Sequence, residues 1–414
     1  MAEKQNTPKI RFEGFTDPWE QRKLGDCFEF LKNNTLSRAD LNGANGTARN
    51  VHYGDILIKF GDCLDGEQSD LPFITDDTVL PKFAESILRE GDVIFADTAE
   101  DEAAGKCVEL RKLPKEPTIS GLHTIPARPR FPFGTGYLGH YLNSDAYHRQ
   151  LLPLMQGIKV ISVSKAALQD TQVRFPSLSE QSAIGVALSE IDNLITLHQR
   201  KYDKLCTVKK SMLDKMFPKP GETEPEIRFE GFTDPWEQRK LGEIFEEYSE
   251  KNRADLPPLT IIQGGGTVYR DESNRNLQFD KNSLSNYKAV NPDDFIVHLR
   301  SFEGGLEKAT CCGLISPAYH TFHGDGIDSD FYYLYFRSKR FIDTDLKPHV
   351  YGIRDGRSID IDGMKTIPIP WTTVNEQRAI GGFYNSFDSF ITLHQRKLEL
   401  LRNIKKSLLD RMFV

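Results

Sequence analysis

The side chains best suited to chemistry in this chain are polar groups gathered in two segments, residues 26–178 and 243–374. Arg, Asn, Gln and His form directed hydrogen bonds to base edges, and Arg and Lys also bind phosphates. The candidates for DNA contact in the first segment are Arg38, Arg49, His52, Tyr53, Lys59, His123, Arg128 and Lys159. Those in the second are Gln263, Tyr269, Arg270, Arg300, His320, Tyr351, Arg354 and Arg357. The competing interpretation of each is an ordinary loop residue.

No catalytic motif accompanies these groups. Gly105-Lys106-Cys107 lacks the upstream glycine and the Ser/Thr of a phosphate-binding loop, and Gly264–Gly266 is a lone glycine run. The chain contains no H-E-x-x-H, G-x-S-x-G or G-x-G-x-x-G, and its six cysteines do not have zinc-ligand spacing. The sequence therefore predicts a chain that does no covalent chemistry itself and binds no metal or cofactor.

The charge balance is acidic overall but uneven. The net charge is -7 across 414 residues, and residues 61–120 alone hold 15 acidic and 6 basic side chains. The remainder therefore carries a small positive excess, and the acidic total does not exclude a nucleic-acid partner. No stretch is apolar enough for a membrane span, and the N-terminus has no apolar secretory core, so we expect a cytoplasmic protein.

The elements that must position the polar segments are revealed by an internal repeat. Residues 10–25 and 227–242 are identical, IRFEGFTDPWEQRKLG in both copies. Residues 179–217 and 375–413 are a second similar pair, and both contain the run ITLHQRK. Duplicated ends thus enclose two unlike middles, which indicates two modules built on one plan.

The second repeated unit has the periodicity of a long helix. Its apolar positions alternate at spacings of four and three residues, as in a coiled coil. The seam residues of the first copy are Ile184, Leu188, Ile191, Ile195, His198, Tyr202 and Leu205. Those of the second are Ile380, Phe387, Ile391, His394, Leu398 and Leu401. Lys209 and Lys405 interrupt the seam, and such polar residues usually fix register and partner choice.

Each helix needs a partner for its apolar stripe, and the nearest candidate is the other copy. Duplicated halves tend to pack about a pseudo-twofold axis, which makes the paired helices antiparallel. Thirty-nine helical residues span about 58 Å. We therefore predict an α+β chain in which two α/β domains are separated by an antiparallel coiled coil.

The polar segments themselves are predicted to mix strands and helices. Strands are expected at residues 55–60, 92–96 and 108–110, and again at 259–262, 294–299 and 310–315. Helices are expected near residues 137–154 and 330–343. The predicted domain boundaries are 1–178, 179–218, 219–374 and 375–414.

The repeated RFEGFTDPWEQRKLG, the EQRAI that begins at Glu376, and ITLHQRK followed by KKSLLDRMF closely resemble the specificity (S) subunit of bacterial type I restriction–modification enzymes. The resemblance covers the whole chain. It implies that residues 1–178 and 219–374 contain target-recognition domains, each reading one half of a bipartite DNA sequence. It also implies that the paired helices set the gap between half-sites.

The resemblance further implies partners and cofactors. Two methyltransferase (M) subunits would bind the helices, and nuclease/translocase (R) subunits would complete the restricting complex. S-adenosylmethionine would bind M, and ATP and Mg would serve R, with no cofactor held by this chain. Because the two middles differ, we expect an asymmetric target.

Two other classes of protein compete with this interpretation. A coiled-coil scaffold could bridge two proteins without touching DNA, but it has no need for paired Arg/Asn/Gln-rich loops. A solitary DNA-cleaving enzyme would need a metal-binding carboxylate motif, which the sequence lacks. We therefore favour the specificity subunit.

Overall fold

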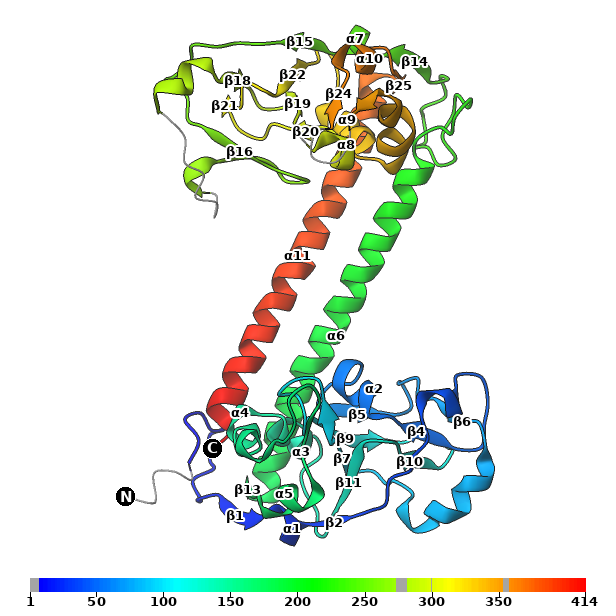
Figure 1. Cartoon of the computed structure of the whole chain (residues 1–414), viewed down its shortest axis with the longest axis vertical. Helices are drawn as coiled ribbons and strands as arrows, with labels where there is room; N and C mark the ends of the chain where they lie inside the picture. The colour runs from blue at the N-terminus through cyan, green and yellow to red at the C-terminus, as the bar shows by residue number, and fades with distance from the viewer. Residues whose placement is uncertain (1–6, 273–280, 299, 353–356) are drawn as a thin grey trace. The chain divides into compact units, whose positions relative to one another are not determined.

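The computed structural model describes residues 7–272, 281–298, 300–352 and 357–414 (Figure 1). The chain divides into two compact units. Unit 1 comprises residues 1–200 and 395–414, and unit 2 comprises residues 201–394. Each unit therefore contains one variable domain, the first part of one long helix and the last part of the other. The domain boundaries expected from the sequence stay a prediction.

Unit 1 is built around a five-stranded sheet of order β2-β11-β7-β9-β5. These strands are Phe28–Phe30, Thr124–Pro129, Val93–Ala96, Cys107–Lys112 and Cys63–Asp65. A four-stranded sheet of order β10-β4-β6-β3 lies beside it, formed by Thr118–Ser120, Arg49–Val51, Phe73–Ile74 and Leu41–Asn42. Two short pairs complete the sheets, β1 (Glu20–Lys23) with β13 (Gln172–Phe175) and β8 (Thr98–Ala99) with β12 (Ile161–Ser162). The strands predicted at residues 92–96 and 108–110 are confirmed.

The short helices of unit 1 correct two sequence predictions. They are α1 (Leu24–Cys27), α2 (Tyr53–Ile58), α3 (Tyr137–Leu142), α4 (Asp145–His148) and α5 (Lys165–Asp170). Residues 55–60 were expected to be a strand, but most of them lie in α2. The reason is local: His52 caps α2, and Arg38 holds Asp55 in its first turn. The helix expected over residues 137–154 is broken into α3, α4 and a short 3-10 turn.

Unit 2 uses a related but smaller framework. Its four-stranded sheet has the order β15-β22-β19-β20, formed by Glu246–Tyr248, His320–His323, Phe295–Val297 and Glu307–Lys308. The paired strands around it are β14 (Glu237–Lys240) with β25 (Pro368–Trp371), β16 (Leu259–Ile262) with β17 (Gly266–Tyr269), β18 (Lys288–Val290) with β21 (Gly313–Ile315), and β23 (Val350–Tyr351) with β24 (Ser358–Ile359). Its short helices are α7 (Leu241–Ile244), α8 (Ser301–Gly304), α9 (Ser329–Phe336) and α10 (Ile361–Lys365). The prediction at 259–262 matches β16, and residues 295–297 of the strand expected at 294–299 form β19, while residue 299 lies outside the described residues. The helix expected over 330–343 is divided between α9 and a π-helical turn at Phe341–Leu346, and only the second half of 310–315 is strand.

The two long helices are α6 (Leu178–Lys215) and α11 (Val374–Met412), close to the predicted bounds. They run antiparallel within each unit. In unit 1, Lys405 contacts Asp192 and Arg402 contacts Gln199. Residue numbers therefore rise along α6 in the direction in which they fall along α11. In unit 2, Lys209 pairs with Asp388. The thirteen predicted seam residues are all buried or half-buried.

The identical segments 10–25 and 227–242 share two sets of contacts in the two units. Arg11 forms a bidentate ion pair with Glu180 at the start of α6, and Arg228 does the same with Glu376 near the start of α11. The N–H of Ile10 donates to the carbonyl of Arg411, as the N–H of Ile227 does to that of Lys215. The repeat therefore encodes a common frame that ties each domain to both helices.

The core of each unit is closed by the end of a long helix. Phe413 packs edge-on against Trp19, Tyr137 and Tyr141 in unit 1. Phe217 takes the same place against Trp236, Phe331 and Tyr335 in unit 2. Among the described residues, no helix is both long and apolar enough to span a membrane.

Candidate nucleic-acid interface

Several candidate residues of the first domain meet around the start of α2. Arg38 donates two hydrogen bonds to Asp55, with Nη2 to Oδ1 at 2.7 Å and Nη1 to Oδ2 at 2.9 Å. The His52 and Tyr53 rings are 4.7 Å apart, and Tyr53 meets the His123 ring edge-on at 5.4 Å. The structure thus brings Arg38, His52, Tyr53 and His123 together, although they come from separate segments.

The electrostatics of this group favour a neutral His52. Burial lowers the pKa of His52, and the charge of Arg38 lowers it further. Its Nδ1 accepts a hydrogen bond from the Gly54 N–H at 3.1 Å. A neutral imidazole with an occupied Nδ1 acceptor carries its proton on Nε2, where it is a directed donor. His123 lies at the exposed side of the group, 3.3 Å from Asp97 Oδ1.

Lys159 is placed on a separate, exposed hairpin tip next to this group. The N–H of Val163 donates to the carbonyl of Asp97 at 2.8 Å, so the hairpin is anchored to the strand edge that also holds His123. Lys159 itself is exposed.

The other candidates of the first domain are engaged within the protein. Arg49 donates to the Leu71 carbonyl at 2.6 Å and stacks 3.6 Å from the Phe73 ring centre. Lys59 donates to the Asp70 carbonyl at 2.8 Å. Hydrogen bonds to these partners give both side chains a structural role, and their part in DNA contact stays a prediction.

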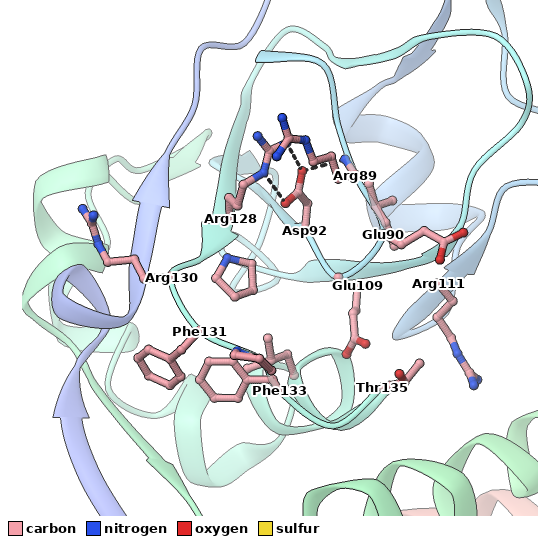
Figure 2. A pocket seen from close by; sticks show the side chains of 15 residues that line it. Arg89, Glu90, Asp92, Glu109, Arg111, Arg128, Arg130, Phe131, Phe133 and Thr135 are labelled. Carbon is pink, nitrogen blue, oxygen red and sulfur yellow. Dashed lines mark hydrogen bonds and ion pairs between the residues drawn. The ribbon is translucent and has the colours of Figure 1, made fainter. Parts of the chain in front are cut away.

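Arg128 is the most strongly engaged of these candidates. It donates to Asp92 through Nε at 2.9 Å and Nη2 at 2.7 Å, and also to the Ile87 carbonyl. Figure 2 shows this ion pair at the rim of a cavity of about 470 Å³. The guanidinium groups of Arg111 and Arg130 also border the cavity but point away from each other (Figure 2). The cavity therefore does not focus its arginines on one ligand.

The second domain presents its candidates on two hairpins. Gln263 lies in the turn between β16 and β17, whereas Tyr269 is the last residue of β17 and pairs with Leu259 at the other end of this hairpin. Both side chains are exposed. The turn is held by the Gly264 N–H, which donates to Glu307 Oε1 at 2.7 Å. Gly264 has φ +80°, a conformation that favours glycine. Arg270 follows β17 and donates to the Leu259 carbonyl at 3.3 Å.

A second group of candidates surrounds a cavity of about 60 Å³ lined by His298, His320 and Arg357. His320 lies 2.7 Å from Glu247 Oε1, and Arg357 lies over the Phe302 ring at 5.3 Å. Burial lowers the pKa of His298 to about 4, with the charges of Arg337 and Arg300 adding to the effect. His298 was not among the predicted residues, because a single histidine directly after a strand carries no distinctive pattern.

Three candidates of the second domain remain, Arg300, Tyr351 and Arg354. Arg300 donates its backbone N–H to His298 Nδ1 at 3.3 Å. Tyr351, at the end of β23, is exposed. Arg354 lies outside the described residues, so its prediction stays open.

A cluster that the sequence did not reveal lies where α11 meets the first domain. The Lys405 ammonium donates to Asp62 Oδ2 at 2.7 Å and to Asp192 Oδ1 at 2.5 Å. His140 is fully buried, with Nδ1 3.0 Å from the same Asp62 oxygen. One ligand atom from each of Asp62, His140 and Asp192 lies within 4.8 Å of the others, a spacing that suits a metal ion. Lys405 already supplies the positive charge at this point.

Comparisons with known proteins identify relatives along the whole chain. Residues 16–206 match a family model described as the type I restriction modification DNA specificity domain. The chain is 21% identical to a putative type I restriction enzyme MjaX specificity subunit of Methanocaldococcus jannaschii, covering 98% of this chain and 95% of the relative. It is 24% identical to the MjaVIII specificity subunit of the same organism, covering 62% of this chain and 64% of the relative.

A solved structure also shares the fold. The crystal structure of the S subunit of a type I restriction–modification system from M. genitalium aligns with a TM-score of 0.55 at 13% identity. The alignment covers 99% of both chains. The two proteins therefore share the whole fold, in which a domain followed by a long helix occurs twice.

Proposed function

We propose that this chain is a specificity subunit of a type I restriction–modification system and that its two domains divide the reading of DNA. Each variable domain reads one half of a bipartite target, and the long helices set the distance between the halves. The domains carry different polar groups on a common frame, so the two half-sites differ in sequence.

The observation that carries this proposal is that the two units share the contacts between domain and helices but differ in their exposed polar side chains. The ion pairs Arg11–Glu180 and Arg228–Glu376 are equivalent, whereas the exposed polar groups are not. In the first domain the reading group is Tyr53 with His52 and His123. In the second it comprises Gln263 and Tyr269, together with the His298–His320–Arg357 group. A frame held constant while its surface varies is what a pair of modular readers requires.

Joining two weak readers makes the recognition strict. Each half-site contact alone binds weakly, but the second contact becomes intramolecular once the first has formed. Affinity is then high only where both half-sites have the right separation. Because the net charge is -7, we propose that this chain alone binds DNA poorly and needs its partners to surround the duplex.

The proposed partners are two methyltransferase subunits on the helices and nuclease/translocase subunits beyond them. Exposed apolar side chains on both helices support this, since their seams already face inward. They are Val186, Leu194, Leu197, Phe390, Leu393, Leu400 and Ile404. In this proposal the chain is non-catalytic, S-adenosylmethionine binds the methyltransferase, and ATP and Mg serve the nuclease/translocase.

The experiment is to express the chain with its neighbouring methyltransferase gene and map adenine methylation across the host genome by single-molecule sequencing. We expect a split motif with a fixed gap. Replacing residues 26–178 with those of a relative should change one half of the motif and leave the other half and the gap unchanged. A stable complex that methylates nothing, or a swap that changes both halves, would contradict the proposal and favour a scaffold.

A further inference from the structure

The segment 152–160 of the first domain ends in an unusually bare apolar tip. The side chain of Ile158 is 98% exposed and that of Val160 is 55% exposed. Leu152 and Leu154, earlier in the same segment, are also exposed. Single exposed apolar residues are common, but four in nine consecutive residues indicate a surface that is covered in the functional state.

This tip is rigidly built. Gln156 and Ser162 exchange two backbone hydrogen bonds, at 3.0 and 2.8 Å, which close the hairpin. Gly157 has φ +114°, and a Cβ at this position would lie 1.9 Å from the Val160 carbonyl oxygen. Only glycine permits such a tight turn, so the exposure of Ile158 follows from a fixed backbone.

An acidic turn follows the strand that pairs with the base of this hairpin. Strand β12 pairs antiparallel with β8, with Ile161 opposite Ala99. Continuing that register brings residues 158–160 toward the residues that follow Ala99, which are Glu100, Asp101 and Glu102. All three are exposed, and none has an ion-pair partner within the described part of the chain. The hairpin 156–160 contributes a single cation, Lys159.

This combination selects among possible occupants. The phosphates of DNA are repelled by three exposed carboxylates, of which only Asp101 is hydrogen-bonded among the described residues, to the Ala103 N–H, and they gain nothing from bare Ile and Val side chains. A protein surface with an apolar centre and a basic rim matches both features. We propose that residues 152–160 and Glu100–Glu102 form a docking surface for a protein partner of that chemistry. Resting on the function proposed above, we assign this partner as the methyltransferase subunit.

The proposal also changes the role of Lys159. The sequence pattern suggested DNA contact, but its neighbours are acidic and apolar. On the docking surface, Lys159 orients the partner rather than reading a base. Affinity at such a surface is concentrated in the central apolar side chains, while the carboxylates mainly speed association and confer salt dependence.

The test titrates purified methyltransferase onto the separately purified full chain and measures the dissociation constant. We expect Ile158→Asp to weaken binding at least about tenfold. Ile58→Asp, which changes a side chain of α2 that is 89% exposed and lies outside both the docking surface and the long helices, is the matched control and should leave binding unchanged. The triple reversal of Glu100, Asp101 and Glu102 to Lys should slow association and reverse its dependence on salt.

The methylation motif separates the outcomes. If Ile158→Asp leaves methyltransferase binding intact but alters the first half-site, the hairpin reads DNA and the docking proposal is wrong. If neither binding nor motif changes, the proposal is equally overturned. A wild-type chain that directs no split-motif methylation would instead contradict the proposed function, independently of the variants.

Discussion

Lys405 of α11 reaches Asp62 of the first domain, with its Nζ 2.7 Å from Asp62 Oδ2. The two residues are 343 positions apart in the sequence. The same ammonium binds Asp192 of α6 at 2.5 Å, so one cation joins the two helices and the domain. Among the described residues, the equivalent lysine of the other repeat, Lys209, pairs with the more exposed Asp388.

Substituting the two repeated lysines should therefore have unequal effects. Lys405→Met leaves two partly buried carboxylates without their counter-charge, and we expect a loss of roughly 2–4 kcal/mol of stability at this junction. Lys209→Met should cost about 0–1 kcal/mol, because Asp388 is 53% exposed and solvated. Hydrogen exchange of residues 395–412 and 201–215 measures both. Equal losses of protection would contradict the unequal burial.

The same junction should weaken in acid. Burial alone would raise the pKa of Asp62, but the hydrogen bond with His140 and the charge of Lys405 outweigh it and lower that pKa to about 2. A carboxylate with a depressed folded-state pKa stabilises the fold above its unfolded value near 4 and loses that contribution as pH falls toward 2.

We therefore expect protection of residues 395–412 to fall between about pH 4 and pH 2, by roughly 2 kcal/mol. Asp62→Asn should be less stable at neutral pH and should lose this part of the pH dependence. An Asp62→Asn variant with the same acid profile as the unmodified chain would show that other carboxylates control the junction.

Two glycines near the beginning of the long helices make a second matched comparison. A Cβ at Gly185 would lie 2.2 Å from the Thr135 carbonyl oxygen, whereas a Cβ at Gly382 would meet nothing within 4 Å. Gly185→Ala should cost about 1–3 kcal/mol through overpacking. Gly382→Ala should stabilise by up to about 1 kcal/mol, because alanine is the better helix former. Thermal unfolding midpoints should move in opposite directions.

The candidate DNA residues of the first domain should separate into two classes. Arg128→Ala leaves Asp92 buried and unpaired, so we expect roughly 3–5 kcal/mol of destabilisation with an unchanged methylation motif. Tyr53→Ala should instead weaken DNA binding or relax the first half-site, with little effect on stability. Unfolding measurements alongside the methylation map distinguish the classes. A relaxed motif in soluble, folded Arg128→Ala protein would place that arginine at the DNA.

The repeated helices were predictable from the sequence, but the contacts between the helices and the domains were not. The heptad pattern of the second repeat, residues 179–217 and 375–413, locates α6 and α11 nearly to the residue, because this signal is local and periodic. The strand expected at residues 55–60 was wrong because Arg38 and His52, outside that window, stabilise a helix. Lys405 was recognised only as an irregular seam residue, since its partner Asp62 belongs to a distant loop.

The candidate interface shows the same division. Residue type identified Tyr53, His52 and His123 but could not reveal that their rings contact one another. Arg128 and Tyr53 look equally suitable in the sequence. Only the position of Asp92 distinguishes a structural arginine from an available side chain.

The packing of Phe413 means that the core of unit 1 is completed late in synthesis. Trp19, Tyr137 and Tyr141 are all synthesised with the first domain, but Phe413, which packs against them, is synthesised more than 200 residues later. Unit 2 has the reverse order, because Phe217 is made before Trp236 and Tyr335. At about 5–20 residues per second, these three aromatic side chains remain without Phe413 for on the order of ten seconds or more. During that interval the nascent first domain exposes the aromatic surface that Phe413 later covers.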